Sequence, residues 1–464
     1  MDQVLRYIDR NKDRFLQELK RLIAIPSVST NPEYKQDIKR CAQWIADHLS
    51  LIGMEKTKIY PTKGNPIIYS DWLQASGKPT ILFYGHYDVQ PAEPLNRWTS
   101  PPFQATVRGQ NLFGRGATDD KGQIFIHFKC IEAYLKTMGK LPINLKILLE
   151  GEEEIGGKNL SKFIEQQKKL LKADLVLISD TAFFAKGVPS ICYGLRGNVF
   201  MRVELRGPNR DLHSGSFGGS IHNPIQALAA MIAQLHDADG HVAIAGFYDD
   251  VRQLTRLERD TYRKLPWNDK RYARDLGVKQ LYGERGFTTL ERLWTRPTLE
   301  CNGIWGGHTG EEARGLLPQK ASANISMRLV PDQNPKKIAK LFETHLRKLV
   351  PKTVSVAIRC LTMAEPTITA IDSPGVRVAV VALKMAFGKD PLFQRDGGSI
   401  PIVNRFKQIL RLDSVLLGFG LPDANEHAPN EFINLGNFFR GIRTVAYFYD
   451  ELPKYLKNRG KNDL

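Results

Sequence analysis

The sequence contains the stretch Thr80-Ile81-Leu82-Phe83-Tyr84-Gly85-His86-Tyr87-Asp88, in which an apolar run ends in two polar side chains. An apolar run of this length, rich in β-branched and aromatic residues, predicts a buried strand, and the glycine marks its end. His86 and Asp88 lie two residues apart, so they share one face of an extended backbone. Such a pair can bind a metal ion while the carboxylate holds the imidazole in one tautomer. The pair is also compatible with a merely hydrogen-bonded strand end.

Strands and helices alternate around this stretch. Strand-like runs at 80–84, 144–149 and 175–179 are separated by helical periodicity at 122–138 and 160–171. The alternation predicts an α/β layer with a mostly parallel sheet and helices on both faces. Ligands bind such sheets beyond the carboxyl ends of the strands. One site can therefore collect the polar residues that follow these strands: His86, the acidic run 152–154 and Asp180.

The pattern changes at about Val199, where apolar and polar residues alternate as in a half-exposed strand. A split βαβ order follows, with helices expected at 224 onward and 335–350 and strands at 323–329 and 354–360. After about Thr367 the α/β pattern returns. We therefore expect a discontinuous first domain, 1–196 and 367–464, interrupted by an inserted, ferredoxin-like α+β domain at 197–366. The polar segment 245–298 reads as helical, without an evident role.

Composition bounds the class of protein. The 464 residues are 42% apolar and 25% charged, which is typical of a soluble enzyme. The net charge is +17, but Lys and Arg are scattered, so we interpret it as a solvated basic surface rather than a nucleic-acid interface. Five cysteines, odd in number and far apart, suit a reducing compartment. No apolar stretch has the length of a membrane span, and we expect a cytoplasmic protein without a membrane partner.

A glycine-rich loop from Gly114 to Gly122 carries the adjacent carboxylates Asp119 and Asp120. A phosphate-binding Walker loop would need Gly-Lys followed by Ser or Thr, and this loop lacks that order. Two carboxylates in a constrained loop suit a bridging metal ligand. They equally suit an acidic helix N-terminus favoured by the helix dipole.

Consecutive acids also crowd at Glu152-Glu153-Glu154. Their mutual repulsion raises the proton affinity of some members. A divalent cation would take up part of the charge and leave a neighbouring carboxylate free as a general base. A solvated acidic turn is the simpler alternative. Asp180 and His427 each follow an apolar run and, taken singly, are compatible with structural roles.

Taken together, these clusters offer two histidines and at least three carboxylates without a thiolate. That donor set suits zinc, with manganese or cobalt as substitutes. Two metals about 3.5–4 Å apart that share one carboxylate would activate a water and polarise a carbonyl. A nucleophilic serine is not indicated, because the sequence has no Gly-x-Ser-x-Gly elbow.

The order and spacing of the motifs resemble a known family. Gly85-His86-Tyr87-Asp88, Asp119-Asp120-Lys121-Gly122 and Glu153-Glu154-Ile155-Gly156 are similar to motifs of the co-catalytic two-zinc metallopeptidases, which include carboxypeptidase G and aminoacylase. Tyr193-Gly194-Leu195-Arg196-Gly197, Asp211-Leu212-His213-Ser214-Gly215 and Gly397-Gly398-Ser399-Ile400-Pro401 resemble the carnosinase and cytosolic non-specific dipeptidase branch. The resemblance covers essentially the whole chain.

The resemblance implies a role for each site residue. One metal would be held by His86, Asp119 and Asp180, and the other by Asp119, Glu154 and His427. Glu153 would be the general base and acid, and Asp88 would orient His86. The peptide bond between Asp119 and Asp120 would be cis.

The resemblance also implies how substrate is held. The inserted domain would be a lid and dimerisation domain, and His213 would act in the partner subunit's site of a homodimer. A small peptide would be bound by four residues, namely Arg328, Gly398, Ser399 and His308, the last of which is also compatible with a simple loop position. The implied activity is dipeptide hydrolysis. An N-acyl-amino-acid deacylase or a carboxypeptidase on the same scaffold is the alternative.

Overall fold

The computed structural model describes residues 1–398 and 400–459. Contacts divide the chain into two units. The first comprises Met1–Tyr193, Thr369–Gln394 and the segment from Ile402 onward, and the second comprises Gly194–Ile368 and Arg395–Pro401. The short segment around Gly398 thus belongs with the second unit, although the expected sequence boundary at 367 would keep it in the first.

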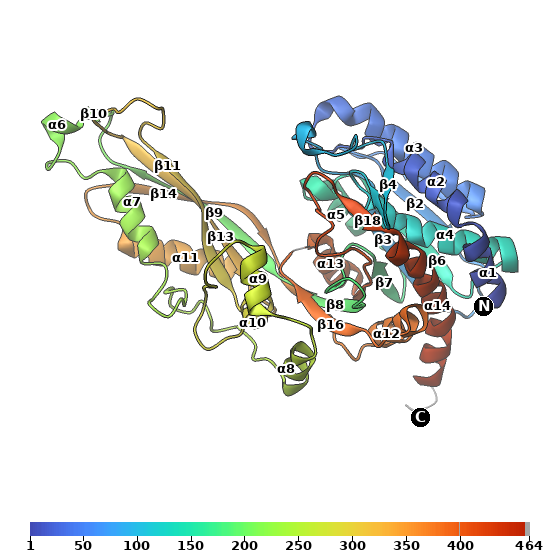
Figure 1. The fold of residues 1–464 in the computed structure, drawn as a ribbon. Helices are drawn as coiled ribbons and strands as arrows, with labels where there is room; N and C mark the ends of the chain where they lie inside the picture. The colour runs from blue at the N-terminus through green and yellow to red at the C-terminus, as the bar shows by residue number, and fades with distance from the viewer. Residues whose placement is uncertain (399, 460–464) are drawn as a thin grey trace. The chain divides into compact units, whose positions relative to one another are not determined.

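The central sheet of the first unit is parallel in its middle and antiparallel at its edges (Figure 1). Its strand order is β1-β2-β6-β3-β7-β17-β8-β15, and the pairs β6–β3, β3–β7 and β7–β17 are parallel. The strands are β1 (Lys56–Tyr60), β2 (Ile67–Trp72), β3 (Thr80–His86), β6 (Asn144–Glu150), β7 (Leu175–Ile178), β8 (Ser190–Leu195), β15 (Thr367–Ile368), β16 (Leu392–Asp396) and β17 (Ser414–Leu416). A small sheet joins β4 (Thr106–Arg108), β5 (Asn111–Phe113) and β18 (Phe432–Asn434).

Helices cover both faces of this sheet, as expected. Phe83 stacks on His127 of the helix α4, with ring centroids 3.7 Å apart, whereas the next residue, Tyr84, packs on Phe406 on the opposite face at 5.4 Å. The helices are α1 (Asp2–Arg10), α2 (Lys12–Ile23), α3 (Lys35–Ile52), α4 (Lys121–Met138), α5 (Lys158–Gln166), α12 (Pro374–Phe387), α13 (Pro401–Arg405) and α14 (Leu435–Arg459). Short turns of helix lie at Pro32–Tyr34, Leu95–Arg97, Glu153–Ile155 and Phe406–Leu410.

Two details of the first unit differ from the sequence pattern. The single helical periodicity of residues 1–25 is interrupted at Asn11, where the backbone leaves the helical region and separates α1 from α2. The helix expected at 160–171 ends at Gln166. At α5 the apolar spacing continues past the helix end, because the following turn also buries Leu171.

The second unit is built on a four-stranded antiparallel sheet with the order β11-β13-β9-β14. Its apolar face packs against α7 and α11. The strands are β9 (Gly197–Arg206), β11 (Thr298–Gly306), β13 (Lys320–Leu329) and β14 (Ser355–Ala364), with a two-residue pair formed by β10 (Leu212–His213) and β12 (Leu316–Leu317). The helices are α6 (Ser214–Phe217), α7 (Pro224–Ala233), α8 (Arg256–Arg263), α9 (Asp269–Asp275), α10 (Thr289–Trp294) and α11 (Pro335–Leu349).

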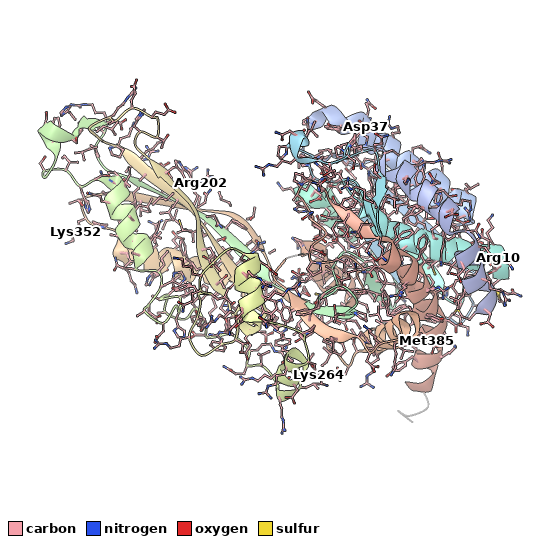
Figure 2. The ribbon with its side chains drawn as sticks, viewed as in Figure 1. Arg10, Asp37, Arg202, Lys264, Lys352 and Met385 are labelled. Carbon is pink, nitrogen blue, oxygen red and sulfur yellow. The ribbon has the colours of Figure 1, made fainter. Side chains whose placement is uncertain are left out.

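Basic side chains are exposed in both units. Arg10, Arg202, Lys264 and Lys352, which are labelled in Figure 2, are examples. No helix among the described residues is long and apolar enough to cross a membrane.

Candidate active site

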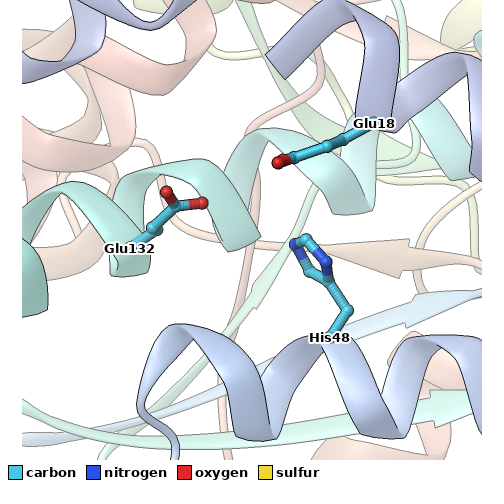
Figure 3. Close-up of side chains that lie close together, drawn as sticks. All are labelled: Glu18, His48 and Glu132. Carbon is cyan, nitrogen blue, oxygen red and sulfur yellow. The ribbon is translucent and has the colours of Figure 1, made fainter. Parts of the chain in front are cut away.

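Three groups of histidine and carboxylate side chains lie close enough together, among the described residues, to hold a metal ion. One of them, Glu18, His48 and Glu132, lies between helices of the first unit (Figure 3). Its carboxylates are already bridged by a buried ammonium, because Lys129 Nζ lies 2.5 Å from Glu18 and 2.6 Å from Glu132. Arg14 pairs with the same two glutamates. A protein cation therefore occupies this group, which leaves the other two as candidate metal sites.

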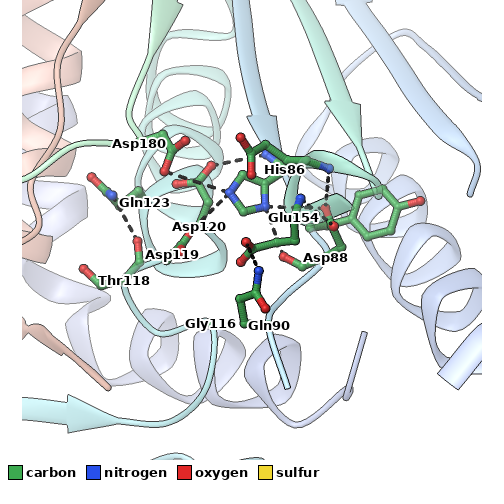
Figure 4. Close-up of polar contacts among 12 residues, drawn as sticks. His86, Asp88, Gln90, Gly116, Thr118, Asp119, Asp120, Gln123, Glu154 and Asp180 are labelled. Atoms are coloured by element: carbon green, nitrogen blue, oxygen red, sulfur yellow. Dashed lines mark hydrogen bonds and ion pairs between the residues drawn. The ribbon is translucent and has the colours of Figure 1, made fainter. Parts of the chain in front are cut away.

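The other two groups meet at the carboxyl ends of the parallel strands. His86 is the last residue of β3, and Asp180 lies two residues beyond the end of β7. His86 Nε2 lies 3.0 Å from Asp119 Oδ1 and 3.9 Å from Asp180 Oδ1 (Figure 4). His427 Nε2 lies 2.8 Å from Asp119 Oδ2 and 3.3 Å from Glu154 Oε2. The two carboxylate oxygens of Asp119 thus face different groups.

Gly85 permits the close approach of the end of β3 to the loop that carries Asp119 and Asp120. A Cβ atom at that position would lie 2.3 Å from Ile124 Cγ2 and 2.8 Å from Asp120 Oδ2. The absence of a side chain lets Asp120 Oδ2 accept the main-chain N–H of His86 at 3.2 Å. The strand end and the loop that carries Asp119 are thereby fixed to each other. The peptide bond between Asp119 and Asp120 is cis, as the family resemblance implies.

The donor set fits a divalent cation. His86 Nδ1 lies 3.0 Å from the main-chain carbonyl oxygen of Asp88, and donation to this oxygen leaves the lone pair of Nε2 directed at the carboxylates. His86 Nε2 and Glu154 Oε1 are buried and have no hydrogen-bond partner in the part of the chain that the structure describes. A lone pair facing carboxylates is repulsive unless a cation lies between them. Imidazole and carboxylate donors without thiolate suit zinc, manganese or cobalt.

Without a bound cation, the pKa values of the side chains in this site show that it carries an excess of negative charge. Burial raises the pKa of Asp180 to about 6, although His86 acts in the opposite direction. Burial, opposed by His86 and reinforced by Asp180 and Glu154, raises the pKa of Glu153 well above its ordinary value. Burial alone would lower the pKa of His86, but the neighbouring carboxylates raise it. Bound cations would relieve this crowding and return these carboxylates to their charged forms.

Asp88 positions the acidic turn as well as His86. Its carboxylate oxygens accept the main-chain N–H groups of Glu153 at 3.3 Å and Glu154 at 3.2 Å. The carboxylate lies 3.5 Å from His86 Nδ1, farther than the residue's own carbonyl oxygen. Gln90 Nε2 donates to Glu154 Oε2 at 2.7 Å. Asp88 therefore aligns the histidine mainly through its backbone and the glutamates through its side chain.

Sequence reasoning missed Glu431. This fully buried carboxylate accepts main-chain N–H groups from Gly116 and Thr118 at 2.9 Å and from Asp119 at 3.1 Å. It also accepts a hydrogen bond from Arg115 Nη1 at 2.7 Å. Glu431 thus holds the loop that presents Asp119. Its sequence neighbours carry no motif, and only the proximity to His427 could have drawn attention to it.

The comparison with known proteins is decisive for the family. Residues 82–451 match the profile described as Peptidase family M20/M25/M40. The chain belongs to this family. It is 32% identical over 471 residues to the Beta-Ala-His dipeptidase of Homo sapiens, covering 98% of this chain and 93% of that relative. It is 33% identical to the Cys-Gly metallodipeptidase dug1 of Schizosaccharomyces pombe, covering 97% and 98%.

Solved structures of M20 peptidases agree with this assignment. Human carnosine dipeptidase 1 superimposes with a TM-score of 0.84 at 32% identity, with 98% of both chains covered. An M20 family metallo-carboxypeptidase, Sso-CP2 from Sulfolobus solfataricus, gives a TM-score of 0.86 at 33% identity, covering 95% of this chain and 99% of the other. The expected family and the mostly parallel α/β fold are confirmed.

The remaining predicted site residues of this M20 peptidase lie in its second unit. Arg328 lies on β13 and is half-buried. His213 is exposed, and its Nδ1 accepts the N–H of Gly215 at 3.1 Å. His308 is exposed beyond the end of β11. Gly398 donates its N–H to Asp396 Oδ1 at 2.7 Å. Ser399 lies outside the described residues.

Proposed function

We propose that this M20 peptidase hydrolyses the peptide bond of dipeptides or short peptides with two bound divalent metal ions. The observation that carries the proposal is the pair of ligand groups that share Asp119. His86, Asp119 and Asp180 would hold one ion, and Asp119, Glu154 and His427 the other. Two such ions, zinc most naturally and otherwise manganese or cobalt, would supply a nucleophilic water and polarise the scissile carbonyl.

Glu153 is the general base and acid in this proposal. Its main-chain N–H is anchored on Asp88, and its neighbour Glu154 belongs to the second ligand group. A carboxylate held beside the reacting water can take its proton and later return it to the leaving amine. Burial, reinforced by the neighbouring carboxylates, raises the pKa of Glu153 and favours proton uptake at this position. Asp88 keeps both Glu153 and His86 in place.

We infer that Arg328 binds the carboxylate of the substrate, because a guanidinium can pair with a carboxylate through two parallel hydrogen bonds. Gly398, Ser399 and His308 would line the same pocket. We also infer a homodimer in which His213 stabilises the oxyanion in the partner subunit's site. Its exposure on the β10–α6 turn supports this role. A cytoplasmic location remains a proposal that rests on five free cysteines.

A carboxypeptidase acting on longer peptides is the second candidate, favoured by the similarity to the Sulfolobus enzyme. An N-acyl-amino-acid deacylase would use the same groups. Elemental analysis, combined with hydrolysis of dipeptides, longer peptides and N-acyl-amino acids before and after chelation, separates these activities. Two ions per chain with chelator-sensitive dipeptide cleavage would support the proposal. Protein that binds no divalent ion and cleaves nothing would refute it.

A further inference from the structure

The second unit has a cavity beside its sheet, lined in part by residues of the face opposite α7 and α11 and in part by Val242 and Leu299 of the core cluster. Val199, Met201 and Ile325 point into the core with α7 and α11. Residues of the opposite parity, Phe200 and Ser326, line a cavity of about 410 Å³ together with side chains from β11 and from the segment 282–297. The volume lies within the roughly 300–1,000 Å³ of small-molecule sites.

The lining of this cavity is cationic. It contains four arginines, Arg196, Arg292, Arg296 and Arg328, and two glutamates, Glu284 and Glu300. Arg296 pairs with Glu284 through two contacts, Nε to Oε2 at 2.7 Å and Nη2 to Oε1 at 2.5 Å. That bidentate pair neutralises both side chains. Arg196, Arg292 and Arg328 then outnumber the remaining carboxylates, which are Glu300 in the lining and Asp396, whose charge also acts on Arg196, so the cavity suits an anionic ligand.

The sheet register places two of these arginines, Arg196 and Arg328, near each other. Asn198 is the cross-strand partner of Arg328, and Arg196 lies two residues before Asn198. Burial, followed by the charge of Arg328, lowers the pKa of Arg196 to about 10. Two like charges held near each other repel. A ligand with two negative groups would relieve this repulsion.

Arg196 is held in place by the turn that follows β16. Its main-chain N–H donates to the carbonyl of Gly398 at 3.1 Å. A Cβ at Gly397 would lie 3.0 Å from Arg196 Nη2, so the guanidinium rests directly against that glycine. The side chain therefore has little freedom to swing away, and its position relative to Arg328 is fixed by the backbone on both sides. Such preorganisation favours recognition of a ligand of defined length.

We propose that this cavity binds a C-terminal residue with two carboxylates, the main-chain carboxylate on Arg328 and the side-chain carboxylate on Arg196. The enzyme would then prefer dipeptides that end in Glu or Asp. The inference rests on the proposed function, which assigns the substrate carboxylate to Arg328. It adds Arg196 as the residue that determines side-chain specificity.

The kinetic test compares Ala-Glu with Ala-Gln, which match in shape and differ in charge. The wild-type enzyme is expected to have a kcat/KM at least about tenfold higher for Ala-Glu, as a charged hydrogen-bonded pair implies. In Arg196→Gln the ratio should collapse towards one. The control is Arg202→Gln, an exposed arginine on the same face of β9 that lies over Trp305 outside the cavity and should keep the ratio (Figure 2). A wild-type ratio near one, or an equal loss for both peptides in Arg196→Gln, would overturn the proposal.

A binding measurement separates this inference from the proposed function. Calorimetry with the full chain in chelator compares L-glutamate with L-glutamine, so no hydrolysis is needed. Tighter binding of glutamate, lost in Arg196→Gln and kept in Arg202→Gln, would support the cavity even if no peptide were cleaved. Equal binding of the two amino acids would overturn the inference even for an active dipeptidase. Loss of glutamate binding in Arg328→Gln as well would assign both carboxylates.

Discussion

Glu431 Oε1 accepts the main-chain N–H of Asp119 at 3.1 Å, across 312 residues of chain. The same carboxylate holds Gly116, Thr118 and Arg115. The residue that both ligand groups share is therefore presented by a loop whose shape depends on a buried acid near the C-terminus. The candidate metal site therefore depends on the packing of the segment that carries Glu431.

Glu431→Gln should loosen this loop. A carboxamide offers one acceptor oxygen and turns N–H donors towards the backbone N–H groups and Arg115, so a buried arginine loses its charged partner. We expect a loss of about 3–5 kcal/mol in the free energy of unfolding, together with weaker metal retention. Urea unfolding and elemental analysis after dialysis measure the two effects. Asp423→Asn, an exposed carboxyl in the same segment, is the control; a Glu431→Gln protein with full metal content and wild-type stability would contradict the role.

Glu153→Gln should retain both metal ions and lose nearly all turnover, because the amide cannot accept the proton of the reacting water. General acid–base catalysis contributes about 10²–10⁴-fold in rate. Glu152→Gln is the matched control. Glu152 belongs to the same acidic run, but its carboxylate is engaged in hydrogen bonds from Asn65 and Asn159. If Glu153→Gln instead loses one metal ion, Glu153 is a metal ligand and Glu154 is the general base.

Arg328→Ala should raise KM for dipeptides strongly, because the bidentate pair with the substrate carboxylate is lost. The effect should be much smaller for a dipeptide whose C-terminus is amidated, which has no carboxylate to bind. Steady-state kinetics with the free and amidated peptide test this split. Unchanged kinetics for the free dipeptide would refute the assignment.

His48 should make stability depend on pH. Burial, with a contribution from Lys129, lowers the pKa of His48 to about 4, below its ordinary value of 6.5. The unfolded chain then binds the proton more tightly, so stability is full above pH 6.5 and falls as pH drops towards 4. We expect this side chain to account for about 1–3 kcal/mol of the loss. The free energy of unfolding of wild type minus that of His48→Phe, measured in chelator between pH 7.5 and 4.5, should decrease over this range; a constant difference would contradict the prediction.

Glu258 should anchor the polar segment 245–298. It caps α8 in a capping box with Thr255 and also pairs with buried Arg395, next to the turn that holds Arg196. Glu258→Gln preserves the cap but removes the charged pair, so we expect lower thermal stability and a raised KM. Glu291→Gln in the equivalent capping box of α10 is the matched control, because no ion pair to Glu291 is present among the described residues. Equal effects of the two changes would assign Glu258 to capping alone.

The fold was predictable wherever local pattern and tertiary burial agree. The apolar run before His86 is a buried strand, and the alternation from Val199 is a half-exposed one. The strand β11 was not foreseen, because it is a sheet edge with exposed residues, such as Cys301 and Trp305, that break the alternation. An edge strand is recognisable only from the partner that it pairs with.

The candidate site divides in the same way. His86, Asp119, Glu154, Asp180 and His427 lie in motifs that sequence alone exposes, and the structure brings them together. Glu431 acts through its contacts with the loop 116–119, which lies more than 300 residues earlier in the chain. Arg196 contacts the turn at Gly398. Neither contact leaves a periodicity or spacing in the sequence.

The second unit leaves the first through adjacent strands. Thr369 donates its N–H to the carbonyl of Tyr193 at 2.8 Å, and Ile368 pairs with Gly194 directly beyond them. For the segment Gly194–Ile368 the chain therefore departs and returns at adjacent strands of the sheet edge, as in a hairpin with a very large tip, whereas Arg395–Pro401 joins the second unit separately. A tight turn joining Tyr193 to Thr369 would close that edge without altering its register. The insertion point is thus a position at which evolution or an engineer could exchange one inserted domain for another while the ligand groups stay in place.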